Sequence, residues 1–125
     1  MIAAGYGRII NIASLATFVA FHEVAAYGAS KAAVGALTRS LAVEWAPHNI
    51  TVNALAPGII PTELNRKIID SPRGRELLIR TPMKRFGNPD EVAGAAVYLA
   101  ATESSFVTGQ ILAIDGGYLA SGVNQ

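Results

Sequence analysis

The chain has 125 residues, of which 51% are hydrophobic and 15% charged, and its ten basic and nine acidic residues give a formal net charge of +1. This composition allows a buried core, which argues against disorder, and the interspersed charges argue against a nucleic-acid surface. The apolar residues are too scattered for a membrane span, there is no cysteine, and His22 and His48 lack metal-ligand spacing. We therefore predict a cytoplasmic protein without a structural metal.

The first part of the chain has the pattern of a strand, a loop and a helix. The isoleucine-rich run Arg8–Ala13 predicts a strand that is buried on both faces, and a loop follows from Ser14 to Val24. From Ala26 to Ala46 apolar residues recur at three- and four-residue steps, which predicts an amphipathic helix that ends before Pro47. The apolar face predicted for this helix consists of Val34, Leu37, Leu41 and Trp45.

A second buried strand is predicted over Ile50–Ala56, and Pro57-Gly58 closes it. We expect Thr62 to cap a short helix that runs to Ile69. Ser71 followed by a proline predicts the start of another helix, which runs to Arg80.

The last part of the chain predicts one more helix and one more strand. Asn88 has the properties of an N-cap, Pro89 stands at the first helical position, and Glu91 completes a capping box. The strand Gln110–Ile114 follows and ends at the turn that begins with Asp115. The apolar face predicted for the helix consists of Val92, Ala95, Ala96 and Leu99.

Buried strands that alternate with helices predict an α/β fold with a parallel sheet and right-handed crossovers. We expect residues 1–125 to form one partial domain with three parallel strands and flanking helices. Such a sheet leaves at least one apolar edge without a partner strand. We expect more chain or another subunit to cover that edge.

Tyr27 and Lys31 stand four residues apart near the start of the predicted helix, so their side chains lie on one face. A lysine ammonium beside a phenol favours the phenolate, and a tyrosine tuned in this way can exchange a proton with an alcohol near neutral pH. The alternative is a surface tyrosine and a solvated lysine. The pair alone does not decide between these interpretations.

Three further features are predicted at the same edge of the sheet. Ser14 follows the first strand, where its hydroxyl either holds a substrate oxygen or caps the strand–loop junction. Pro57 and Gly58 end the second strand as a ligand-binding loop or as a plain turn. Thr62 follows, where its hydroxyl either hydrogen-bonds a polar group of a ligand or caps a helix. Ligands usually bind at the carboxyl ends of parallel strands, so the convergence of these features with Tyr27 at that edge favours an enzyme site.

The stretch from Asn11 to Leu64 closely resembles the short-chain dehydrogenase/reductase family. It has a serine after the strand, thirteen residues to Y-x-x-x-K, then V-N-x-x-x-P-G and a threonine. The run FVTGQILAIDGGYLASG resembles the end of that family's sequences. The run RTPMKRFGNPDEVAGAAVYLA is similar to gluconate 5-dehydrogenases, although 3-oxoacyl reductases share most of it.

The resemblance implies a reversible hydride transfer between NAD or NADP and a secondary alcohol or ketone, with a sugar acid or polyol as the substrate. By this resemblance Tyr27 is the general acid and base, Lys31 binds the nicotinamide ribose, and Ser14 orients the substrate oxygen. The loop that packs on the nicotinamide and binds its carboxamide then consists of Pro57, Gly58, Ile60 and Thr62. The family also implies a homo-oligomer.

The chain departs from the family pattern in one large respect. It lacks the glycine-rich turn that receives the pyrophosphate, the residue that selects NAD or NADP, and the asparagine of the family's proton relay. The resemblance therefore implies the C-terminal half of a Rossmann-type doubly wound sheet, with the glycine-rich half absent and with no activity of this chain alone. The alternative is a non-catalytic truncated fragment or a self-associating module.

Overall fold

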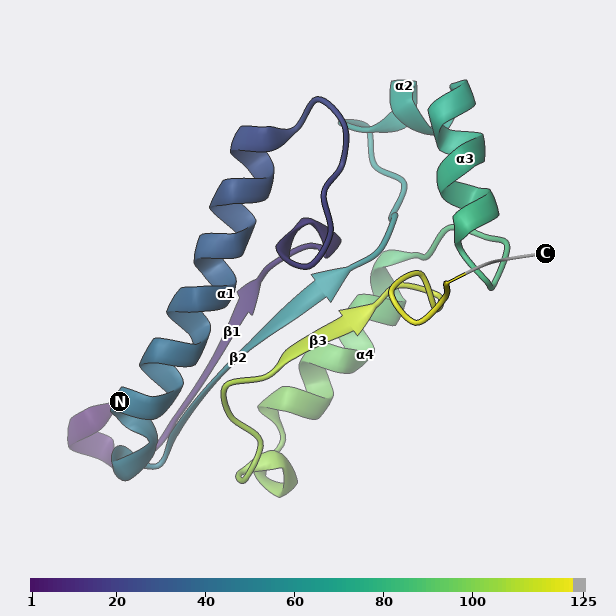
Figure 1. Ribbon diagram of the computed structural model, residues 1–125. Helices are drawn as coiled ribbons and strands as arrows, with labels where there is room; N and C mark the ends of the chain where they lie inside the picture. Colours follow the sequence, from purple (N-terminus) through teal and green to yellow (C-terminus); the bar gives the residue numbers. More distant parts are fainter. Residues whose placement is uncertain (123–125) are drawn as a thin grey trace.

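Parallel strands form the centre of the structure, a computed structural model that describes residues 1–122 of the chain (Figure 1). Within these residues β1 (Gly7–Ile12), β2 (Ile50–Pro57) and β3 (Ile111–Ile114) form one sheet in the order β1-β2-β3. Both pairings are parallel, so the carboxyl ends of the strands meet at one edge. The predicted α/β fold is confirmed, and each strand boundary lies within one residue of the prediction.

The helices are α1 (Ala25–Trp45), α2 (Arg66–Ile69), α3 (Pro72–Arg80) and α4 (Pro89–Ala100). Short 3₁₀ turns occur at Ile2–Ala4, Leu15–Thr17, Ala46–His48 and Thr102–Ser104. The capping box of α4 is confirmed, because the Asn88 side chain accepts a hydrogen bond from the Glu91 amide and the Glu91 carboxylate accepts one from the Asn88 amide. Within residues 1–122 no helix is both long and apolar enough to cross a bilayer.

The predicted cap at Thr62 is wrong, because α2 begins only at Arg66 and Asn65 occupies its N-cap position. The Asn65 amide group donates to the Ile60 carbonyl at 2.8 Å, and its side-chain oxygen accepts from the Thr62 amide at 2.8 Å. Asn65 thus holds the preceding segment in a hydrogen-bonded turn. Ser71 does occupy the N-cap position of α3, but its hydroxyl donates to a carbonyl of α2 instead of capping.

The predicted apolar face of α1 is confirmed at Val34, Leu41 and Trp45, which pack against the core, and is wrong at Leu37. Leu37 is 53% exposed, whereas the small residues Gly35, Thr38 and Ala42 are buried against the sheet. Small side chains let the helix axis lie close to the strands, since a Cβ at Gly35 would come within 2.8 Å of a Thr17 methyl. The half-buried residues that flank this line are Val34, Leu41 and Trp45.

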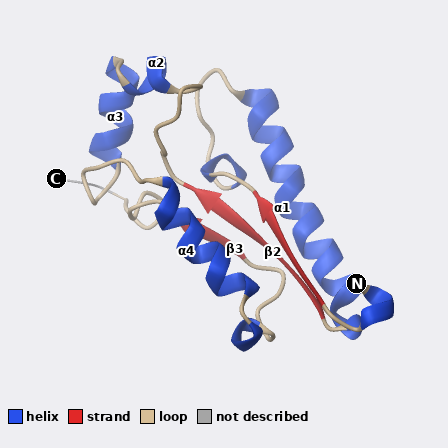
Figure 2. Cartoon of the chain, turned by 180° about the vertical axis from the view of Figure 1, so that it is seen from behind, coloured by secondary structure: helices blue, strands red, loops and turns tan. Residues whose placement is uncertain are grey.

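β2 is covered on both faces. Ile50 and Val52 pack with Ala42 of α1, so the alternating residues Asn53 and Leu55 face the opposite side of the sheet. That opposite side is covered by α4, which contacts all three strands and lies across the sheet from α1 (Figures 1 and 2). All four of these β2 residues are at most 2% exposed, which confirms the strand as fully buried.

The two crossovers differ in hand. The chain moves in the same direction across the sheet from β1 to β2 and from β2 to β3, while α1 and α4 lie on opposite faces (Figures 1 and 2). The β1–α1–β2 connection is right-handed as predicted, and the connection through α4 is left-handed. The preference for right-handed crossovers applies to a strand that is followed by a single helix and then by the next parallel strand. Here α2 and α3 intervene before α4 and bring the chain round to the other face.

Candidate active site

A cavity of about 580 Å³ lies at the carboxyl ends of β1 and β2. Its walls come from the loop before α1, the first turns of α1, the loop after β2, and α2 and α3, which close the upper side (Figure 1). All of the site residues predicted from the sequence line this one cavity: Ser14, Tyr27, Lys31, Pro57, Gly58, Ile60 and Thr62. The fold thus brings them together, while their chemical roles remain predictions.

Tyr27 and Lys31 occupy the first two turns of α1, on the side that faces the cavity. The Lys31 ammonium lies 5.7 Å from the centre of the Tyr27 ring and donates a hydrogen bond to the Ile12 carbonyl at 2.8 Å. An ammonium group has three N–H donors, so two remain for other acceptors. Tyr27 is 49% exposed, which leaves its phenol accessible from the cavity.

Ser14 is the N-cap of the 3₁₀ turn Leu15–Thr17, and its hydroxyl oxygen accepts a hydrogen bond from the Ala16 amide at 3.1 Å. The hydroxyl proton is still available to a ligand, because an accepted bond uses only a lone pair. Both interpretations of Ser14, as a cap and as a substrate-binding group, are therefore compatible. The Thr17 hydroxyl donates to the Lys31 carbonyl at 3.0 Å and so fixes this turn to α1, a positioning contact that the sequence pattern did not reveal.

Gly58 is a glycine because of internal packing. Its amide donates to the Ile114 carbonyl at 2.8 Å, and a Cβ at this position would lie 2.7 Å from the Asp115 Cα. The close approach that requires glycine is therefore to the end of β3, and of the two interpretations predicted for Pro57-Gly58 it favours a packed turn at Gly58 itself. This contact fixes the path of the loop from Pro57 to Ile60 along the cavity wall.

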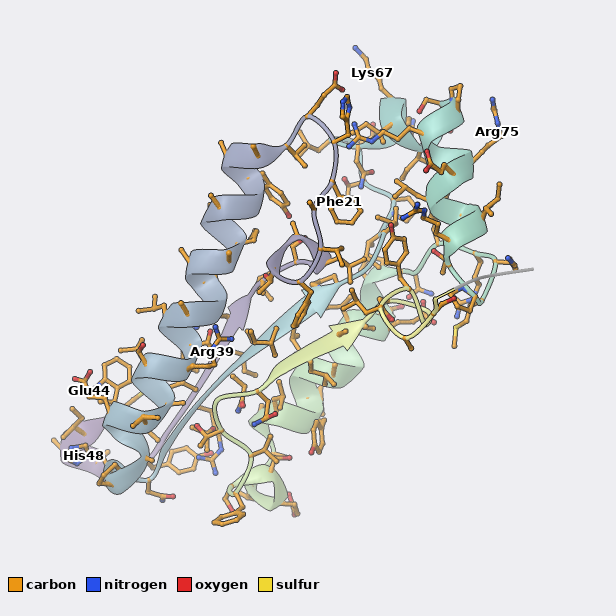
Figure 3. The ribbon with its side chains drawn as sticks, viewed as in Figure 1. Phe21, Arg39, Glu44, His48, Lys67 and Arg75 are labelled. Atoms are coloured by element: carbon orange, nitrogen blue, oxygen red, sulfur yellow. The ribbon has the colours of Figure 1, made fainter. Side chains whose placement is uncertain are left out.

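Arg73 is a cavity residue that the sequence analysis missed. It stands at the start of α3, and its guanidinium donates to the His22 carbonyl at 2.5 Å and lies 3.7 Å from the Glu23 carboxylate. Phe21 also lines the cavity from the loop before α1 (Figure 3). These contacts join two segments about fifty residues apart in sequence, so no local pattern could have indicated them.

An ion pair between Arg85 and Glu91 joins the loop after α3 to the first turn of α4. Arg85 donates two hydrogen bonds to the Glu91 carboxylate, at 2.9 and 2.6 Å. Hydrogen bonds from Arg85 and from the Asn88 amide lower the pKa of Glu91 from 4.5 to about 2. The Gly87 amide donates to the Ile59 carbonyl at 3.0 Å, so the pair lies next to the loop that lines the cavity.

The lowered pKa of Glu91 predicts an acid-dependent contribution to stability. Because the folded-state value lies below the unfolded one, the contribution is fully present above about pH 4.5 and is lost as the pH falls toward about 2. We expect Glu91→Gln to lower the urea midpoint of unfolding at about pH 6 and to approach the wild type as the pH falls toward about 2. Glu44→Gln, at an exposed position on α1, is the control (Figure 3). A wild-type advantage that persists unchanged in acid would contradict the prediction.

Residues 1–119 match the family model described as enoyl-(acyl carrier protein) reductase. The chain is 48% identical to an NAD-dependent glycerol dehydrogenase of Listeria innocua, over 94% of this chain and 46% of that protein. It is 49% identical to a 2-dehydro-3-deoxy-D-gluconate 5-dehydrogenase of Bacillus subtilis, over 95% of this chain and 47% of that protein. The chain thus spans about half the length of these relatives.

Among solved structures, the chain is similar to a gluconate 5-dehydrogenase of Burkholderia cenocepacia in complex with NADP and tartrate. The two share 44% sequence identity and superpose with a TM-score of 0.93, over 97% of this chain and 48% of that one. The three parallel strands and their helices therefore correspond to about half of that longer chain.

Proposed function

The chain belongs to the short-chain dehydrogenase/reductase family, and on that premise we propose that it carries the catalytic half of an oxidoreductase acting on a sugar acid or polyol. The proposed reaction is hydride transfer between NAD or NADP and a secondary alcohol. The observation that carries the proposal is the single cavity that Ser14, Tyr27 and Lys31 line together at the ligand edge of the sheet. The relatives support it, since they include both polyol and sugar-acid dehydrogenases.

In the proposed mechanism Tyr27 exchanges a proton with the reacting oxygen of the substrate. During alcohol oxidation its phenolate accepts the hydroxyl proton, with the Lys31 ammonium 5.7 Å from the centre of the same ring. Ser14 donates its hydroxyl proton in a hydrogen bond to the same substrate oxygen and holds it near the ring. When bound, the nicotinamide would accept the hydride from the carbinol carbon. The product is a ketone, and the reverse reaction returns the proton from Tyr27.

The donors present in the cavity fit the nicotinamide ribose part of the cofactor. Lys31 has two N–H groups beyond its bond to Ile12, which suit two adjacent ribose hydroxyls. Pro57, Ile60 and Thr62 offer an apolar wall with one hydroxyl, which suits a planar ring with a carboxamide. A preference for NAD or NADP remains open, since one relative is NAD-dependent and another structure contains NADP.

Binding of NADPH to the chain, measured by fluorescence or calorimetry, tests the proposal. We expect a dissociation constant below the millimolar range, and we expect Lys31→Ala to raise it about tenfold through the lost charge-assisted hydrogen bonds. Lys67→Ala, on the exposed surface of α2, is the matched control and should bind like the wild type (Figure 3). Binding that is absent or only millimolar would support the second candidate.

That second candidate is a non-catalytic fragment or self-associating module. It is favoured by the outer edge of β1, which pairs with no strand among residues 1–122 and exposes 53% of Ile12. An unpaired edge of this kind readily accepts another chain. Self-association and a cytoplasmic location remain predictions under either candidate.

A further inference from the structure

The charges that line the cavity have one sign. Among the described residues of its walls, Lys31 and Arg73 are charged, and none is an aspartate or glutamate. Resting on the proposed function, we propose that the enzyme selects substrates that bear a carboxylate and that Arg73 binds this group. This choice separates sugar acids from the neutral polyols.

The two cations face different ends of a substrate. Lys31 is bonded to Ile12 and lies beside the Tyr27 ring, so it serves the reacting hydroxyl and the ribose. Arg73 comes from α3, on the other side of the cavity, and lies beside the loop that precedes α1. A sugar acid would therefore place one hydroxyl at Tyr27 and its carboxylate at Arg73, whereas a polyol has no anionic group for the guanidinium.

The guanidinium of Arg73 is held in place and has donors to spare. Its bond to the His22 carbonyl fixes the orientation of the side chain, which is 32% exposed. A guanidinium carries five N–H donors in a planar fork that matches a carboxylate, and the carbonyl takes one of them. Arg73 can therefore bind a carboxylate without giving up the contact that positions it.

Glu23 competes only weakly for this guanidinium. The nearest atoms of the two side chains are 3.7 Å apart, beyond hydrogen-bond distance, and the Glu23 side chain is 73% exposed. Exposed ion pairs of this kind contribute little, because water screens both charges. The cavity that Arg73 lines also has apolar walls, which weaken the screening of a charge relative to open water: Phe21, Val24, Ile68, Ile69 and Leu77.

The test compares D-gluconate with D-sorbitol, which has an alcohol in place of the carboxylate, by calorimetric or NMR titration of the chain. We expect gluconate to bind about tenfold more tightly, and Arg73→Gln to remove that advantage while sorbitol binding is unchanged. Arg75→Gln removes the same charge from the same helix at a side chain that points away from the cavity (Figure 3), and it should have no effect. Glu23→Gln removes the weakly competing carboxylate and should leave gluconate binding unchanged or slightly stronger.

Several results would overturn the proposal. These are equal binding of gluconate and sorbitol by the wild type, no detectable binding of gluconate, or an Arg73→Gln variant that loses both ligands equally. Arg73→Lys keeps the charge and the fold, so it should retain part of the gluconate advantage. A chain that binds NADPH but does not favour gluconate would contradict only this proposal. A chain that favours gluconate through Arg73 but binds no NADPH would contradict only the oxidoreductase assignment.

Discussion

Tyr27→Phe is expected to reduce the rate of NADP⁺ reduction with D-gluconate by about 10²–10⁴-fold, the range typical of a lost general acid or base. The substitution removes the phenol oxygen that would accept the substrate proton, and leaves the ring that lies 5.7 Å from the Lys31 ammonium. Since Tyr27 is 49% exposed and the substitution removes only its oxygen, the fold should be unaffected. The rate is followed by the absorbance of NADPH with concentrated protein and excess cofactor, because the chain spans about half of its relatives. A wild-type rate equal to the background without protein would instead bear out the expectation that this chain has no activity alone.

Tyr98→Phe is the matched control for this experiment. Tyr98 lies on α4, is 52% exposed and does not line the cavity, so the same atom is removed from a comparable surface position. Its rate should equal that of the wild type. A Tyr27→Phe variant that keeps the wild-type rate, with an unchanged unfolding transition, would exclude Tyr27 as the proton-transfer residue.

The largest expected effect on stability is that of Leu99→Ala. Leu99 is 1% exposed and is the one fully buried side chain of α4 among the described residues, on the side of the sheet that Leu55 also faces. Removing its side-chain methyl groups should cost about 2–5 kcal/mol of unfolding free energy, through lost burial and the cavity left behind. Urea denaturation followed by circular dichroism measures this loss.

Val97→Ala is the internal comparison, two residues away on the same helix. Val97 is 70% exposed, so its substitution should change the unfolding free energy by no more than about 0.5 kcal/mol. Similar losses for the two variants would show that α4 does not pack on the sheet through Leu99.

The strands and α4 could be predicted from local sequence because their signals are local. An isoleucine run, a continuous segment of buried residues and the Asn88–Glu91 capping box each determine their own structure. The buried line of small residues on α1 could not be predicted, since hydrophobicity pointed to Leu37 while the close approach to the sheet involves Gly35 and Thr38. The left-handed crossover depends on where α2 and α3 lie. The hydrophobic periodicity of the sequence carries no information on that placement.

The site was predictable where residues follow strand ends or helix turns. Ser14 and Tyr27 belong to elements whose positions the parallel sheet determines, so their convergence on one cavity could be foreseen. Arg73 could not, because it reaches the cavity only through the docking of α3 onto the His22 carbonyl. Asn65 was overlooked for a similar reason, since asparagine side chains bridge nearby main-chain groups in many turns without marking a particular one.

The bond from Lys31 to the Ile12 carbonyl limits how a neighbour can join the sheet. The Ala13 amide donates toward β2, and main-chain groups alternate in direction along a strand. The main-chain N–H and C=O groups of Ile12 and Ile10 therefore point to the open side of β1. The last of these carbonyls is already taken by the ammonium. A strand added along β1 would therefore compete with the Lys31 ammonium at the Ile12 carbonyl, whereas the main-chain groups of Ile10 are available to it.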